Sequence, residues 1–292
     1  MDQDRDIGGI KRNAMGDMTT MVVDCHHHIY DPNWPVDPRA VLAAPRKGIQ
    51  DYEQTKARLG ISHSVVIQPS TYGYDNAGLV DAIERLGRDC ARGVAVTPVD
   101  ASAADLAALA DAGVVALRVN MQLNQAISAA ADVPRLAARC ADRGWHLEIN
   151  APAALIAQHA KLWCDLPCHL VLDHIANLPA ASYPDDVARR AVANLIDRGH
   201  TWVKLSGPYF GCSQRPYLLS SSEALIRWFV ERCAHRLVWG SNWPHPTEPR
   251  CHPPDELSFM NTLRDEWITH LEDRDRIFFR NAMQLYQFSA PI

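Results

Sequence analysis

The sequence lacks the features that mark several common classes of protein. Its eight cysteines are scattered and form no CxxC pair, so neither a disulfide framework nor a zinc ribbon is indicated. No stretch reaches the roughly 18 apolar residues of a membrane span, and no GxGxxG or GxxxxGKS/T motif follows an apolar run. A net charge of −5 argues against nucleic acid or an anionic membrane as the main partner. We therefore expect a cytoplasmic protein that binds a small molecule.

Residues 1–20 also lack an apolar run of signal-peptide length, and their polar composition predicts a loose N-terminal leader. Hydrophobic residues make up 47% of the chain, enough for residues 21–292 to build one large domain without metal or disulfide staples. Nothing in the sequence fixes the oligomeric state, and a homo-oligomer stays open.

From residue 21 onward, short apolar runs alternate with amphipathic stretches that end at Gly or Pro. This alternation indicates a parallel sheet covered on both faces, and eight such units indicate closure into a barrel. We predict a single-domain α/β fold, a (β/α)8 barrel of the TIM type, with an open doubly wound sheet as the alternative. The expected strands cover residues 21–25, 64–69, 93–98, 114–120, 146–150, 170–173, 201–206 and 237–240, with helices between them and after the last.

Polar side chains gather where these strands end, which is where barrels of this kind carry their active sites. Side chains alternate along a strand, so His26 and His28 point into one pocket while His27 points elsewhere. His174 follows the sixth strand at the same end of the barrel. A histidine run can also be only a polar strand exit, and His174 a core histidine. The convergence of all three favours a site.

Arg118 interrupts the apolar run VVALRVNM, and a buried arginine needs an anionic partner. Glu148 or Asp173 can supply one structurally, but we favour the carboxylate of a substrate. Arg215, in the loop GCSQRPY, is a weaker second candidate for the same role.

Several segments resemble the amidohydrolase superfamily, in order from about residue 22 to residue 288. They are DCHHHIYD, QPSTYGYDN, ALRVN, LVLDHIANLP, VKLSG, VWGSNWPHP and RNAMQLYQF. More narrowly, they are similar to the branch that contains 2-pyrone-4,6-dicarboxylate lactonase and related lactone-processing enzymes. The resemblance implies a barrel enzyme with His26, His28 and His174 in its active site.

The sequence departs from the superfamily at its metal ligands. Asn242 stands where most members have an aspartate, no histidine ends the fifth strand, and no bridging lysine ends the fourth. An amide is no general base and offers a metal only a neutral oxygen. We therefore expect no binuclear centre and favour a site without a cofactor. A single Zn²⁺ held by His26, His28 and His174 is the alternative.

The first functional hypothesis is a hydrolase that opens a small carboxylated lactone. The three histidines would polarise the carbonyl and activate water, with Asn242 beside them as a fourth catalytic residue. The expected substrate-binding residues are Arg118, Ser70, Arg215, Tyr72 and Asn150.

Other readings stay open. A sugar-acid lactone isomerase of the galactarolactone type is the runner-up, because the resemblance implies that such isomerases also carry Asn in the GxNWPH motif. There a substrate hydroxyl replaces water as the nucleophile. A non-catalytic barrel that binds a carboxylate and a metal-holding decarboxylase are the remaining alternatives.

Overall fold

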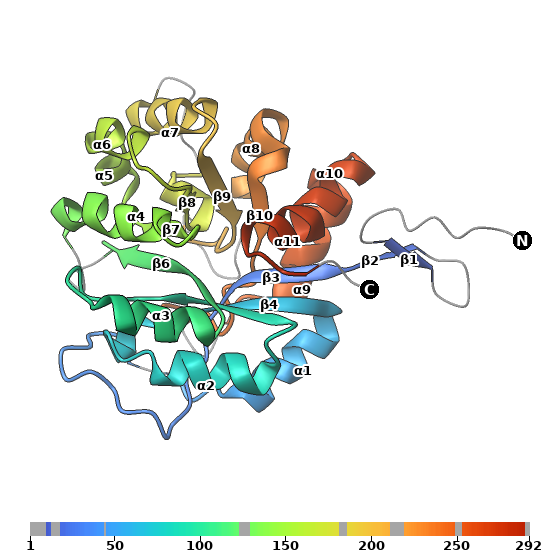
Figure 1. Ribbon diagram of the computed structural model, residues 1–292. Helices are drawn as coiled ribbons and strands as arrows, with labels where there is room; N and C mark the ends of the chain where they lie inside the picture. Colours follow the sequence, from blue (N-terminus) through green and yellow to red (C-terminus); the bar gives the residue numbers. More distant parts are fainter. Residues whose placement is uncertain are drawn as a thin grey trace, which may run out of the picture.

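The structure is a computed structural model that describes residues 10–12, 18–43, 45–122, 129–180, 186–210, 219–248 and 253–289. Within these residues a ring of strands lies at the centre and helices surround it (Figure 1). The eight predicted strands are present and form one parallel sheet in chain order, so the (β/α)8 prediction is confirmed. They are β3 (Val22–His27), β4 (Ile61–Ile67), β5 (Ala91–Ala95), β6 (Val114–Asn120), β7 (His146–Asn150), β8 (Leu170–Leu172), β9 (Thr201–Leu205) and β10 (Leu237–Trp239).

The helices that follow each strand cover the outside of the barrel (Figure 1). They are α1 (Ile49–Leu59), α2 (Ala77–Leu86), α3 (Ala103–Asp111), α4 (Val133–Ala141), α5 (Ala153–Gln158), α6 (Ala160–Cys164), α7 (Val187–Asp197), α8 (Glu223–Cys233), α9 (Glu256–Asn261), α10 (Leu271–Asp275) and α11 (Asn281–Leu285). Short turns η1 (Ser70–Tyr72), η3 (Ala130–Asp132), η4 (His174–Asn177), η5 (Leu219–Ser222) and η6 (Ala234–Arg236) and π-helical segments η7 (Thr262–Trp267) and η8 (Arg276–Arg280) complete the connections.

The helix ends follow the expected local chemistry. Ser102 accepts a hydrogen bond from the backbone N–H of Asp105 at the start of α3, and the Asp105 carboxylate accepts one from the backbone of Ser102. Gly144 and Gly199, which follow α4 and α7, have φ angles of 66° and 84°. Such positive φ angles suit glycine because it has no Cβ.

Hydrogen bonds between β3 and the residues after β10 join the two ends of the sheet. Asp24 accepts from the backbone N–H of Ser241 at 2.9 Å and from its hydroxyl at 2.6 Å. The backbone N–H of Asn242 donates to the carbonyl oxygen of His26 at 2.8 Å. Gly240 permits this approach, because a Cβ there would lie 2.7 Å from the Cβ of His26.

Apolar side chains fill two layers. One layer lies between the strands and the helices, and the strands are apolar on both faces as parallel strands of a covered sheet must be. The second joins side chains of the strands, such as Val23 and Val238, to Phe279, Leu285 and Tyr286 near the C-terminus. The Tyr286 hydroxyl donates to Glu148 of β7, so the C-terminal segment helps to hold the Glu148 side chain in place.

Residues 1–20 contain two short strands, β1 (Ile10–Arg12) and β2 (Met18–Thr20), which pair with each other and with no strand of the barrel that the structure describes. No helix in the described ranges is long and apolar enough to cross a membrane.

Candidate active site

β3 brings His26 and His28 to one pocket, with their Nε2 atoms 3.3 Å apart. His27 instead stacks on Tyr52 of α1, with ring centroids 3.7 Å apart. A register shift between Asp24 and His27 marks a bulge at the end of the strand, a feature that often re-aims side chains next to active sites. The alternation expected for the HxH motif is therefore present.

The proton positions in this pair follow from its neighbours. Lys204 only donates, so the Nδ1 of His26, 3.2 Å from Nζ, accepts. The carbonyl oxygen of Ile67 only accepts, so the Nδ1 of His28, 2.9 Å away, carries a proton. The contact between the two Nε2 atoms is then a donation from His26 to His28. Asp173 lies farther from the same nitrogen of His26, at 3.4 Å, and would require the opposite proton placement.

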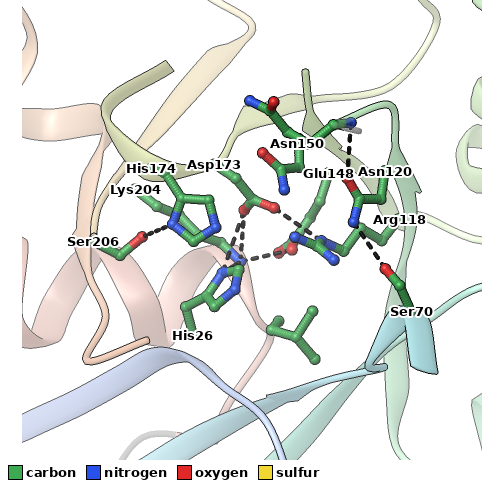
Figure 2. A network of polar contacts seen from close by, with 12 residues as sticks. His26, Ser70, Arg118, Asn120, Glu148, Asn150, Asp173, His174, Lys204 and Ser206 are labelled. Carbon is green, nitrogen blue, oxygen red and sulfur yellow. Dashed lines mark hydrogen bonds and ion pairs between the residues drawn. The ribbon is translucent and has the colours of Figure 1, made fainter. Parts of the chain in front are cut away.

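Four charged side chains form a buried cluster beside His26 and His174 (Figure 2). Lys204 lies 2.6 Å from Glu148 and 3.4 Å from Asp173, while the Nε of Arg118 donates to the other Asp173 oxygen at 2.9 Å. Burial raises the pKa of Asp173, but Lys204 and Arg118 outweigh burial and hold it well below its usual range. Two anions thus face two cations, and the cluster is neutral.

His174 lies in a left-handed turn at the end of β8. Its ring centroid is 4.6 Å from that of His26, and its Nδ1 is 3.0 Å from the hydroxyl of Ser206. It lines a cavity of about 680 Å³. The φ angles of residues 174 to 177 are 52°, 56°, 55° and 49°, although none of these residues is glycine. Left-handed backbone costs a non-glycine residue about 1–2 kcal/mol, so strain is concentrated where His174 is presented.

Glycine at the fully buried Ala176 should relieve part of this strain. We expect Ala176→Gly to raise the free energy of unfolding by about 0.5–1 kcal/mol, because glycine adopts positive φ without a Cβ penalty. The matched control is Ala137→Gly, also buried but inside α4, which should lower stability by about 1 kcal/mol. Urea unfolding of both variants measures the difference. Equal losses in the two would show that the turn carries no strain.

Burial keeps the site histidines neutral. It lowers the pKa of His28 to about 3, with help from Arg118, and that of His174 to about 3 although Asp173 acts in the opposite direction. The pKa of His26 is also held well below its usual value by burial and by Lys204. Neutral imidazoles can donate through one nitrogen and accept through the other, as carbonyl polarisation and proton transfer require.

The predicted substrate-binding residues are only partly brought together. Arg118 and Asn150 lie at the site, and Ser70 accepts a hydrogen bond from the neighbouring Asn120 at 2.8 Å (Figure 2). Tyr72 lies elsewhere: it lines a separate cavity of about 510 Å³ with Trp34. Its hydroxyl donates to the carbonyl of Asp31. Arg215 falls outside the residues that the structure describes.

The structure also includes partners that the sequence analysis did not assign. Glu148 was considered only as a possible partner of Arg118, and Lys204 was assigned no role, yet both are fully buried beside the histidines and pair with each other. Asn242 is buried, and its amide Nδ2 donates to the hydroxyl of Tyr209 at 2.7 Å. Tyr209 lies in the connection after β9, and no sequence signal pointed to it.

The donors available for a metal form a cluster that differs from the expected one. His26, Asp173 and His174 have potential ligand atoms within 4.8 Å of one another, with Asp173 in place of His28. However, both Asp173 oxygens already face cations, Arg118 and Lys204. A divalent ion would add two uncompensated charges to a buried cluster that is already neutral. Binding of a divalent ion by His26, Asp173 and His174 would therefore compete with the ion pairs that Asp173 makes with Arg118 and Lys204.

Comparison with known proteins finds relatives that are named as lactone-processing enzymes. It is 29% identical to a 2-pyrone-4,6-dicarboxylate hydrolase of Comamonas testosteroni over 90% of this chain and 89% of the relative. It is 25% identical to a D-galactarolactone isomerase of Agrobacterium fabrum over 91% of both chains.

Solved structures share the fold. A ligand-free protein of Agrobacterium tumefaciens aligns with a TM-score of 0.85 and 22% identity, over 93% of this chain and 95% of the other. An amidohydrolase of Burkholderia multivorans, solved with bound zinc, aligns with a TM-score of 0.74 and 18% identity, over 92% of this chain and 99% of the other. The amidohydrolase family profile matches residues 23–288, nearly the whole barrel. The chain therefore belongs to the amidohydrolase family, as its motifs and barrel predict.

Proposed function

We propose that this protein is a hydrolase that opens a small carboxylated lactone without a resident metal. The observation that carries the proposal is the state of Arg118, which is 4% exposed and pairs with Asp173 only through Nε. Its two terminal nitrogens have no hydrogen-bond or ion-pair partner among the described residues. A desolvated guanidinium of this kind is suited to bind a substrate carboxylate through two parallel hydrogen bonds.

The neutral histidines supply the chemistry next to this anchor. The Nε2 of His174 has no partner among the described residues, while Ser206 engages its Nδ1. With Ser206 donating to Nδ1, Nε2 carries the proton and can donate to the lactone carbonyl. The same hydrogen bond strengthens as the carbonyl oxygen becomes an oxyanion, and a stronger bond in the transition state accelerates the reaction.

The Nε2 of His28 accepts the proton of the attacking water, once its 3.3 Å contact with the Nε2 of His26 opens and frees that lone pair. A new C–O bond forms as the water O–H bond breaks, and the proton moves to this imidazole. The developing oxyanion offsets its positive charge and raises its proton affinity, since Asp173 and Glu148 are already paired with Arg118 and Lys204. When the ring C–O bond breaks, the leaving oxygen takes this proton back. The product is a hydroxy acid whose new carboxyl group ionises in solution.

Lactone isomerisation is the second candidate, because Asn242 and one curated relative favour it. The cavity next to His174 is mixed in character. Its wall includes the apolar Ile175, Leu178, Phe210 and Leu225, and also Gln122, Asn177 and Ser222, which can bind hydroxyl groups. Both a planar lactone ring and a hydroxylated sugar lactone therefore find partners there, and the products formed distinguish the two reactions.

A panel of carboxylated lactones tests the proposal. Loss of the lactone with release of one equivalent of acid supports hydrolysis, and lactone exchange without acid release supports the isomerase. Saturable binding without turnover would instead support the non-catalytic barrel. Activity that survives exhaustive chelation, at undiminished kcat, is expected if no metal resides in the site.

Arg118→Met should weaken binding of the carboxylated substrate by about 2 kcal/mol or more, because a buried charge pair loses one partner. The variant should lose little further affinity for a neutral ester analogue of the same lactone. Arg118→Lys is the matched control, since it keeps the charge but cannot form two parallel hydrogen bonds to a carboxylate. Its substrate affinity should lie between those of the parent and of Arg118→Met. Normal substrate binding by Arg118→Met together with a lower melting temperature would show that the arginine is only a structural partner of Asp173.

A further inference from the structure

A chain of contacting polar side chains runs from Asn242 to Arg58 and includes none of His26, His28 and His174. The hydroxyl of Tyr209, which receives the Asn242 amide, lies 2.7 Å from the Nδ1 of His245. The Nε2 of His245 lies 2.8 Å from Glu256, and Arg58 of α1 pairs with the other oxygen of that carboxylate. Four of these five side chains are buried, and they come from four places in the chain, because Asn242 and His245 share the turn after β10. The proposed mechanism uses none of the groups beyond Asn242.

Each donor in this line is fixed by the next group. Burial alone would raise the pKa of Glu256, but the hydrogen bond and the electrostatic attraction of His245, with a smaller effect of Arg58, outweigh burial and lower the pKa, so the carboxylate is an acceptor. The Nε2 of His245 must then carry a proton, and with Nδ1 bare that nitrogen is an acceptor, which is the tautomer that the ¹⁵N-histidine spectrum described below tests. The Tyr209 hydroxyl donates to that nitrogen, and a lone pair of the same oxygen receives the N–H of Asn242.

These proton positions determine the orientation of the Asn242 amide. An amide can rotate by half a turn and exchange its oxygen and nitrogen with little change of shape. Here the nitrogen must face Tyr209, because only a donor satisfies an oxygen whose own proton is committed to His245. The Asn242 oxygen is thereby kept off Tyr209, and it has no hydrogen-bond partner among the described residues.

The backbone keeps this amide close to the reacting groups. Asn242 has a φ of 58° and His245 a φ of 59°, and the N–H of His245 bonds the carbonyl of Asn242 at 2.8 Å. The N–H of Asn242 in turn bonds the carbonyl of His26 at 2.8 Å. The tight turn therefore ties the amide to β3 on one side and to Tyr209 on the other.

We propose that Tyr209, His245 and Glu256 are positioning residues that hold the Asn242 amide with its oxygen available to the nucleophile. The oxygen accepts one O–H of the attacking water and orients it, while His28 takes the other proton. This role rests on the proposed hydrolysis. It also accounts for an amide at a position where most of the superfamily has an aspartate. Orienting the water needs only a hydrogen-bond acceptor, which the amide oxygen provides, and not a general base.

A double-mutant cycle tests the coupling. Tyr209→Phe removes only the hydroxyl and should lower kcat about tenfold, with KM changed little, because the amide is no longer oriented. In the Asn242→Ala background the same substitution should have no further effect on kcat. Multiplicative effects in the double variant would mean that Tyr209 acts independently of Asn242 and would overturn the proposal. A melting curve of each variant confirms that it is folded.

Two variants of His245 provide a matched pair. His245→Gln can still accept from Tyr209 and donate to Glu256, whereas His245→Leu can do neither. We expect the glutamine variant to retain most of the parent kcat and the leucine variant to match Tyr209→Phe. Equal losses in both variants would argue against a hydrogen-bonded chain.

A spectroscopic measurement separates this inference from the proposed function. In the full-length protein labelled with ¹⁵N-histidine, His245 should show a protonated Nε2 and a bare, hydrogen-bonded Nδ1, and Tyr209→Phe should shift the Nδ1 resonance. If the tautomer is as expected but no lactone is turned over, the chain stands and the hydrolase proposal fails. A protonated Nδ1 in the parent protein would contradict the chain whatever the activity.

Discussion

Replacing Lys204 with Met is expected to destabilise the protein by about 3–5 kcal/mol, because it leaves two buried carboxylates without their shared cation. Lys204 is fully buried and lies 2.6 Å from Glu148 and 3.4 Å from Asp173. Arg118 still pairs with Asp173 in the variant, so Glu148 is the carboxylate left with an uncompensated charge. Urea unfolding at pH 7.5 measures the loss.

The double variant Lys204→Met, Glu148→Gln is the control for that experiment. It removes one positive and one negative charge together, so the cluster is neutral again and much of the lost stability should return. If the single variant is as stable as the parent, the four charges do not form the tightly coupled cluster described above. If the double variant is less stable than the single one, the cost comes from lost packing and not from charge.

Acidification should destabilise the protein steeply between about pH 6.5 and pH 4. An unfolded histidine binds a proton below about pH 6.5. In the folded protein, burial lowers the pKa of His28 and of His174 to about 3. Stability that these two contribute is therefore present above pH 6.5 and is lost as the pH falls toward 3. The loss for two histidines is about 3 kcal/mol per pH unit.

Other buried groups modify this slope in known directions. Burial lowers the pKa of His26 and of His27 well below the usual value, and both add to the loss. Asp24 opposes it: burial raises its pKa to about 6, so its contribution increases as the pH falls from 6 to its unfolded value near 4. The net result is still a protein that takes up several protons on unfolding at pH 5.

Calorimetric unfolding at pH 7.5 and pH 5 measures this difference, and the buffer dependence of the unfolding enthalpy counts the protons. His28→Asn should reduce the proton uptake by about one, because it removes one titrating group. Equal stability at the two pH values would contradict the neutral, buried state of the histidines on which the proposed chemistry depends.

The fold could be predicted because its signal is local. Parallel strands covered on both faces are apolar along their whole length, so all eight stand out in the sequence. The strand starts were predicted less accurately. β4 begins at Ile61 and not at residue 64, because Ser62 and His63 are polar and partly exposed and so interrupt the apolar pattern by which a buried strand is identified. The N-terminal ends of barrel strands lie away from the site and tolerate such polar residues.

The site could be predicted only where a residue's position along its strand, the strand phase, determines where its side chain lies. Phase placed His26, His28 and His174 at one end of the barrel, and the structure has their rings close together. Strand phase does not say which charges pair: the sequence left Glu148 and Asp173 open as partners of Arg118, and the structure selects Asp173 and places Lys204 between the two carboxylates. Tyr209 meets His245 from a different strand end, and no spacing rule predicts that contact or the one between His245 and Glu256.

The most direct test of the central claim is turnover of a carboxylated lactone in ¹⁸O-labelled water, with the product analysed by mass. Hydrolysis at the carbonyl predicts one ¹⁸O atom in the new carboxylate of every product molecule from the first turnover. Asn242→Asp should retain this labelling and shift the pH dependence of kcat, because a carboxylate replaces a group that cannot titrate. An unlabelled product with a shifted ring would contradict the account and establish lactone isomerisation in its place.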